Sequence, residues 1–199
     1  MAGACRQILA SVALAFLPVY FQRAFPAHKA QYAVINAMTL ISCGFLSNIL
    51  GSIICTKLEK RTHLAKSLVT VGGNLIGIPF FAATCLTTSF PVAIFCNFMH
   101  YLFMSYYLAP SITLMQSSTS PKNAGLVISV ETFFAFLVGT VAPLIFGSLA
   151  NSMGALQNPR AYGKVTCLAM IIGSTLSNIF YFRAGLRYRD RMRESEQKA

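Results

Sequence analysis

The stretch AGLVISVETFFAFLVGTVAPLIFGSLAN, residues 124–151, decides the class of this protein. Its residues are almost all apolar, and Glu131 is the one charged side chain among them. A helix needs about 20 predominantly apolar residues to cross the hydrocarbon core of a bilayer, and this stretch exceeds that length. The stretch therefore predicts a membrane-spanning helix over Ala124–Asn151.

The composition of the whole chain agrees with a membrane class. Of its 199 residues, 55% are hydrophobic and only 11% are charged, with a mean hydropathy of +0.61. An average soluble domain carries about 25% charged residues. A soluble domain of this size could not bury so much apolar surface in one core, whereas lipid can receive it. We therefore expect an all-α membrane protein.

Five further apolar segments bring the predicted number of spanning helices to six. They are Gln7–Phe21, Tyr32–Thr56, Leu64–Thr87, Phe90–Gln116 and Tyr162–Phe182. The first is short for a full span, and a signal peptide is its alternative interpretation. A helix missing its first turns is favoured, because the segment runs on without a cleavage site; a start codon inside a longer reading frame would produce the same pattern.

The basic residues predict the topology of the six helices. The net charge of +11 is split into short clusters between apolar runs, which does not resemble the basic face of a nucleic-acid-binding domain. One side of the membrane receives twelve: Arg6, Lys57, Lys60, Arg61, Lys66, Lys122, Arg183, Arg187, Arg189, Arg191, Arg193 and Lys198. The other receives four: Arg23, Lys29, Arg160 and Lys164. The positive-inside rule therefore predicts both termini in the cytosol.

This pattern divides the chain into two parts. Residues 1–186 form the predicted six-helix transmembrane domain, and residues 187–199 form a basic cytosolic tail that anchors the topology. We expect lipid to surround the six-helix domain. The sequence fits a lysosomal membrane and a plasma membrane equally.

A family resemblance enters at SIICTKLEKR, residues 52–61. This stretch resembles the G-x-L-a-D-R-x-G-R-R loop of the major facilitator superfamily, in the copy between the eighth and ninth helices. The loop residues are Ser52, Thr56, Lys57, Glu59, Lys60 and Arg61; the three basic ones keep the pattern, and the other three replace its Gly, Asp and second Gly. In the family this loop acts as a cytoplasmic gate, and the missing Asp removes one partner of a charge-paired latch.

Two more stretches extend the resemblance to nearly the whole chain. APSITLMQSSTSPK, residues 109–122, is similar to the end of the tenth helix and its loop in Spinster-like members. GTVAPLIFG, residues 139–147, is similar to the eleventh helix, which is rich in small residues. The resemblance implies the C-terminal half of a transporter, helices seven to twelve, that moves a small solute or lipid by alternating access with an N-terminal half.

Polar residues inside the predicted spans are the candidate site residues. Glu131 is a candidate proton carrier or partner of a substrate cation, because an intramembrane carboxylate is costly and usually marks function; a protonated carboxyl bonded to a neighbouring helix is the alternative. His100 is a second candidate, since it titrates near neutral pH. The predicted substrate-lining residues are Asn36 and, at helical spacings of three and four, Asn97, His100, Met104, Tyr107 and Ser111. Hydrogen bonds that merely hold helices together are the alternative for these residues.

The sequence shows no enzyme signature, no metal-ligand spacing and no cofactor motif. The alternative to transport is therefore a non-transporting scaffold or regulator that associates with full-length transporters.

Overall fold

The computed structural model is built of helices and describes residues 2–117, 119–120, 122–154 and 158–198. The helices are α1 (Ala2–Ala24), η1 (Pro26–His28), α2 (Lys29–Glu59), α3 (Ala65–Leu86), α4 (Phe90–Met104), η2 (Ser105–Tyr107), α5 (Leu108–Ser117), α6 (Ala124–Ser152) and α7 (Pro159–Lys198). Six helical segments of the described chain are long and apolar enough to cross a membrane, with η1 continuing into α2 and α4, η2 and α5 together making one. The six predicted spans are confirmed.

The first helix is longer than the sequence predicted. We expected a short span over Gln7–Phe21, but α1 begins at Ala2 and its apolar segment covers Gly3–Ala24. Arg6 lies inside this helix with 1% of its surface exposed, so it is not a charge flanking the span. The prediction was wrong because an arginine was expected to end the apolar segment, whereas neighbouring helices bury this one.

The fourth predicted span is a helix with an internal break. The sequence predicted one helix over Phe90–Gln116, but the turn η2 separates α4 from α5. Pro110 explains the break, because its ring has no N–H to donate to the carbonyl of Tyr106 and clashes with it. In the turn, the Leu108 N–H bonds the carbonyl of Ser105 rather than that of Met104.

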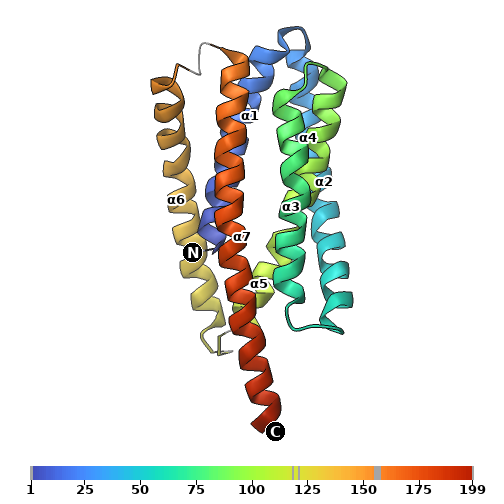
Figure 1. The fold of residues 1–199 in the computed structure, drawn as a ribbon, viewed down its shortest axis with the longest axis vertical. Coiled ribbons are helices and arrows are strands. Elements are labelled where there is room, and N and C mark those ends of the chain that lie inside the picture. Colours follow the sequence, from blue (N-terminus) through green and yellow to red (C-terminus); the bar gives the residue numbers. More distant parts are fainter. Residues whose placement is uncertain (1, 118, 121, 155–157, 199) are drawn as a thin grey trace.

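The main contacts between helices follow the order α6, α1, α7, α3, α4, α2, and α5 at the end of the fourth span also touches α6, α3 and α2. α6 packs mainly on α1, and α2 mainly on α4 and η2, and these two helices lie at opposite sides of the bundle (Figure 1). The two edge helices are accordingly the least buried of the spans. Large apolar side chains such as Ile41 on α2 (75% exposed) and Leu144 on α6 (72% exposed) face outward.

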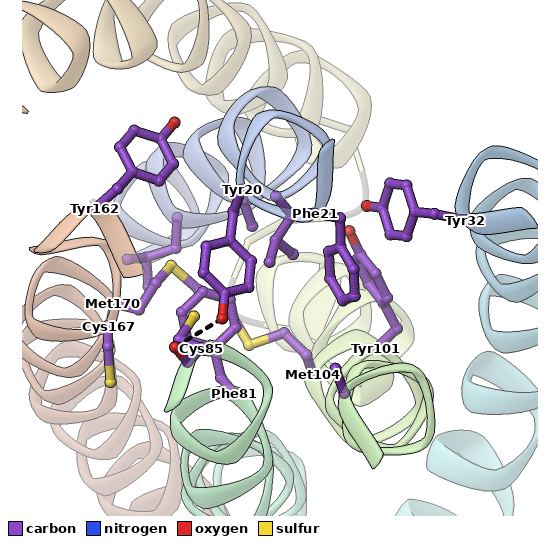
Figure 2. Close-up of a cluster of buried hydrophobic side chains, with 14 of the residues drawn as sticks. Tyr20, Phe21, Tyr32, Phe81, Cys85, Tyr101, Met104, Tyr162, Cys167 and Met170 are labelled. Carbon is purple, nitrogen blue, oxygen red and sulfur yellow. Dashed lines mark hydrogen bonds between the residues drawn. The ribbon is translucent and has the colours of Figure 1, made fainter. Parts of the chain in front are cut away.

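The larger hydrophobic core lies among α1, α3, α4 and α7 (Figure 2). Phe21 of α1 stacks on Tyr32 of α2, with ring centroids 4.2 Å apart. Tyr20 donates a hydrogen bond to the carbonyl of Cys85 at 2.8 Å, which joins α1 to the end of α3. All six cysteines are free thiols.

Most of the basic residues gather at one end of the bundle, which we call the basic end. The α2–α3 turn, the start of α6 and the end of α7 all lie there, and α7 projects beyond the other helices (Figure 1). Residues 187–198 continue α7 as helix, so this part of the predicted tail is an extension of the last span.

Candidate functional site

A buried arginine on α1, Arg6, lies at the centre of a group of polar side chains in the interior. Arg6 donates a hydrogen bond through Nη2 to the carbonyl of Met104, at the end of α4. Its guanidinium carbon lies 4.8 Å from the ring centroid of Tyr107 in η2, in a cation–π contact. The break before α5 makes this arrangement possible, because the Met104 carbonyl lacks the bond from the Leu108 N–H that a continuous helix would supply.

The predicted substrate-lining stripe of the fourth span faces this arginine and α3. His100 is 1% exposed, and its Nδ1 lies 3.0 Å from the carbonyl of Gly77 on α3. A carbonyl can only accept, so Nδ1 carries the proton and Nε2 is the unprotonated nitrogen; Nε2 has no hydrogen-bond partner among the described residues. His100 is also close enough to Arg6 for the charge of the guanidinium to act on it.

The other members of the stripe are held at different depths. Asn97, Met104 and Ser111 are buried, whereas Tyr107 is partly exposed. Ser111 donates its hydroxyl proton to the carbonyl of Leu108 at 3.0 Å. Asn36 on α2 is partly buried, and its Oδ1 has no hydrogen-bond partner among the described residues.

Glu131 lies on the face of α6 that packs against α1. Its Oε1 lies where a Cβ on Gly3 would stand, so a side chain at position 3 would displace the carboxylate. Tyr107 of η2 and Tyr181 of α7 are both close enough to Arg6 and to Glu131 for the two charges to act on them. The hydroxyl of Tyr181 has no hydrogen-bond partner among the described residues.

These contacts define the Arg6 cluster: Arg6, His100, Tyr107, Ser111, Glu131 and Tyr181. It is assembled from α1, α4, η2, α5, α6 and α7, and it brings together four residues that the sequence singled out. Sequence reasoning missed Arg6 and Tyr181. The signal for Arg6 was its place only three residues after Gly3, at the start of an apolar run; Tyr181 carried no signal beyond its place in a span.

The predicted gate residues lie at the end of α2 and in the turn that follows. Thr56 donates its hydroxyl to the carbonyl of Ser52 at 2.9 Å, and Lys57, Lys60 and Arg61 are exposed. Glu59 has a partner that the motif comparison did not anticipate, since its Oε1 lies 3.3 Å from Nζ of Lys66 on α3.

Lys66 connects this turn to two other elements. Its Nζ donates a hydrogen bond to Ser117 Oγ at the end of α5, at 2.8 Å, and lies 4.9 Å from the ring centroid of Tyr188 on α7. A carboxylate thus joins a basic residue at the basic end, although it occupies a different position from the Asp of the family motif.

Two open cavities lie at the other end of the bundle. One, of about 660 Å³, is lined by residues of α1, α3 and α7, including Tyr20, Arg23 and Lys164. The other, of about 650 Å³, lies between α2 and α4 and is mainly apolar. Neither is lined by the predicted substrate-lining residues. No group of three or more His, Cys, Asp or Glu side chains in the described part of the chain could hold a metal ion.

Comparison with known proteins gives one sequence relative and two solved structures of interest. The relative is an MFS-type efflux pump of Mycolicibacterium smegmatis, 21% identical over 174 residues, which are 87% of this chain and 41% of the pump. No family profile matches the chain.

The solved structures are of a bacterial homologue of the human lysosomal transporter Spinster. Its inward-facing, unoccupied conformation superposes with a TM-score of 0.69 and 18% identity, over 96% of this chain and 47% of that one. The inward-facing, occupied conformation gives a TM-score of 0.58 and 19% identity, over 94% and 49%.

The chain thus spans less than half the length of the proteins that it matches, all of which are transporters. Its six apolar helices make it a multi-pass integral membrane protein. The sequence resemblance to the major facilitator superfamily is matched by the similarity of fold. The chain therefore has the fold of one six-helix half of a major-facilitator transporter, of the kind seen in a Spinster homologue.

Proposed function

We propose that this chain is the C-terminal half of a Spinster-like transporter and that it moves a small solute or lipid by alternating access with an N-terminal half. The carrying observation is the bundle of six apolar helices that matches about half of a transporter chain. In alternating access, two such halves rock about a site between them. The exposed apolar faces of α2 and α6 supply surface for lipid and for the second half.

The Arg6 cluster supports a transport role, because ionisable residues within a membrane are costly to bury and usually mark a pathway for substrate or protons. His100 and Glu131 are the proposed proton carriers. Nε2 of His100 is available for a proton, and Glu131 is partly exposed on α6. Asn36, Asn97, Met104, Tyr107 and Ser111 are proposed, with His100, as the substrate-lining wall.

The turn after α2 is proposed as part of a cytoplasmic gate. Lys66 contacts Glu59, Ser117 and Tyr188, so one side chain links four helices at the basic end. A movement that opens this end must either break these contacts or move all of the contacting groups together. With the basic end in the cytosol, the end of α7 lies on the cytosolic side, and α1 begins part of the way along the bundle (Figure 1). The cytosolic side of both termini, which the basic residues predict, is part of this proposal.

Flux through proteoliposomes tests the proposal. The chain is reconstituted alone, and together with the N-terminal half of a full-length relative supplied as a separate polypeptide. Uptake of ethidium and of a fluorescent lysolipid is measured. We expect uptake only when both halves are present, and we expect His100→Ala and Glu131→Gln to reduce it about tenfold or more, in the range that a lost general acid–base group costs.

Ser129→Ala is the matched control on α6, because Ser129 is exposed and bonds only the carbonyl of Gly125. It should leave uptake unchanged. If the chain gives no uptake with an N-terminal half but changes the uptake of a full-length relative, it acts as a regulator and the transport proposal is wrong.

A further inference from the structure

We propose that Arg6 binds the negatively charged group of the solute, so that the Arg6 cluster takes a small organic anion. That the anion is a transported solute rests on the proposed function. The anion-binding site itself rests only on the side chains of this chain.

The guanidinium of Arg6 has N–H donors that make no hydrogen bond to the described residues. An arginine presents five N–H donors in a planar fork that matches a carboxylate, sulfonate or phosphate. In Arg6, Nη2 donates to the Met104 carbonyl, but Nε and Nη1 have no hydrogen-bond partner among the described residues. Buried polar groups are nearly always satisfied, so two such nitrogens on a side chain that is 99% buried indicate an absent partner.

The positive charge of Arg6 has no ion-pair partner among the described residues. Neither of the ion pairs found among the described residues involves Arg6; they join Glu59 to Lys66 and Arg189 to Asp190. A carbonyl and an aromatic ring offset only part of the cost of burying a full positive charge. An anion supplies the missing countercharge.

An aromatic ring and a hydroxyl group lie near the guanidinium. Tyr107 presents its ring to Arg6, and Tyr181 of α7 brings a hydroxyl that has no hydrogen-bond partner among the described residues. These groups suit an anion whose body is planar or aromatic. The titratable groups that face the site are His100, Tyr107, Tyr181 and Glu131, and Glu131 is the one acid among them.

The negative charge of Glu131 opposes the binding of an anion at Arg6. The carboxylate of Glu131 meets α1 at Gly3, three residues before Arg6, and its negative charge therefore repels an anion bound at Arg6. Substitution of Glu131 with Gln therefore favours binding.

Binding to the purified full chain in lipid nanodiscs tests the site without any need for flux. The probe is benzenesulfonate, which stays negatively charged over the working pH range, and its neutral analogue is benzenesulfonamide. Calorimetric titration should show binding of the sulfonate and little or none of the sulfonamide. Arg6→Gln should weaken sulfonate binding at least tenfold, as expected for the loss of about one charge-assisted hydrogen bond pair.

Two further variants sharpen the test. Arg6→Lys keeps the charge but loses the planar fork, so it should bind the sulfonate with an affinity between those of the wild type and Arg6→Gln. Glu131→Gln should tighten binding about threefold or more, because a repulsive charge is removed. Arg183→Gln is the control, since Arg183 is an exposed arginine on α7; it should bind as the wild type does.

Equal binding of sulfonate and sulfonamide, or equal weakening by Arg6→Gln and Arg183→Gln, would overturn the proposal and leave Arg6 as a structural bond to the Met104 carbonyl. If Arg6→Gln does not fold, the Glu131→Gln variant decides, because unchanged affinity there also overturns it. Selective sulfonate binding without flux in proteoliposomes would refute the transport function but keep the anion site.

Discussion

At the scale of single residues, the interior of this half-bundle is held by hydrogen bonds between helices as well as by apolar packing. Asn74 of α3 donates from Nδ2 to Oδ1 of Asn178 on α7 at 2.6 Å, and to the carbonyl of Ser174 at 3.2 Å. Asn74 is 1% exposed, so water does not compete for these bonds. Such pairs fix how two helices are rotated against each other.

The Asn74–Asn178 pair predicts a measurable coupling energy. Asn74→Ala and Asn178→Ala should each lower the free energy of unfolding by about 1 kcal/mol, the usual scale of such bonds in membranes. The double variant should lose less than the sum, with a coupling of about 0.6–1.7 kcal/mol. Unfolding in mixed micelles measures all four proteins. Strict additivity would show that the two amides do not depend on each other for stability.

At the scale of elements, small residues decide how closely α3 approaches α4. A Cβ on Gly73 would stand 2.8 Å from the carbonyl oxygen of Phe103 and 3.2 Å from Cβ of Tyr106. A Cβ on Gly72 would meet nothing within 4 Å. The close contact between α3 and α4 therefore falls on Gly73, and Gly72 lies outside it.

The two adjacent glycines give a matched pair of variants. Gly73→Ala should destabilise the protein by about 1–3 kcal/mol, because the carbonyl of Phe103 must move away and α4 with it. Gly72→Ala meets open space and should be neutral or stabilising by up to about 1 kcal/mol, since alanine has the higher helix propensity. Thermal unfolding in detergent compares them. An equal effect of the two substitutions would contradict the close approach of α3 and α4.

At the scale of the whole molecule, the six helices place their connections at two ends that differ in how many basic residues they carry. The exposed residues Lys57, Lys60 and Arg61 and the last turns of α7 lie at the basic end. The η1 turn and the α3–α4 turn lie at the other (Figure 1).

This arrangement predicts which loops an impermeant maleimide can reach. In sealed vesicles with the cytosolic face outward, Asn123→Cys at the basic end should be labelled directly. Thr88→Cys, in the opposite turn, should be labelled only after detergent is added. Five of the six native cysteines are buried and Cys5 is partly buried, so the wild type sets a low background. The reverse pattern would place the basic end outside the cytosol.

The sequence by itself determined the class and the number of spans, and it placed the ends of α3 and α6 to within one residue. These are local properties: an apolar run of sufficient length must be helical in lipid, because only a helix satisfies its own backbone there. For example, the α6 helix was predicted over Ala124–Asn151 and is found at Ala124–Ser152. A long apolar run therefore predicts the ends of its helix well. The polar stripe on the fourth span was equally visible, because helical spacing alone puts its members on one face.

Only the tertiary structure decided what those residues meet. An arginine near the start of an apolar run can flank a helix or be buried in a bundle, and the burial of Arg6 depends on α4, η2 and α7. The partner of Glu59 is likewise chosen by how α2 and α3 turn towards each other. Spacing along one helix fixes which side chains share a face, but the partner of that face depends on packing between segments far apart in sequence, and that packing created the Arg6 cluster.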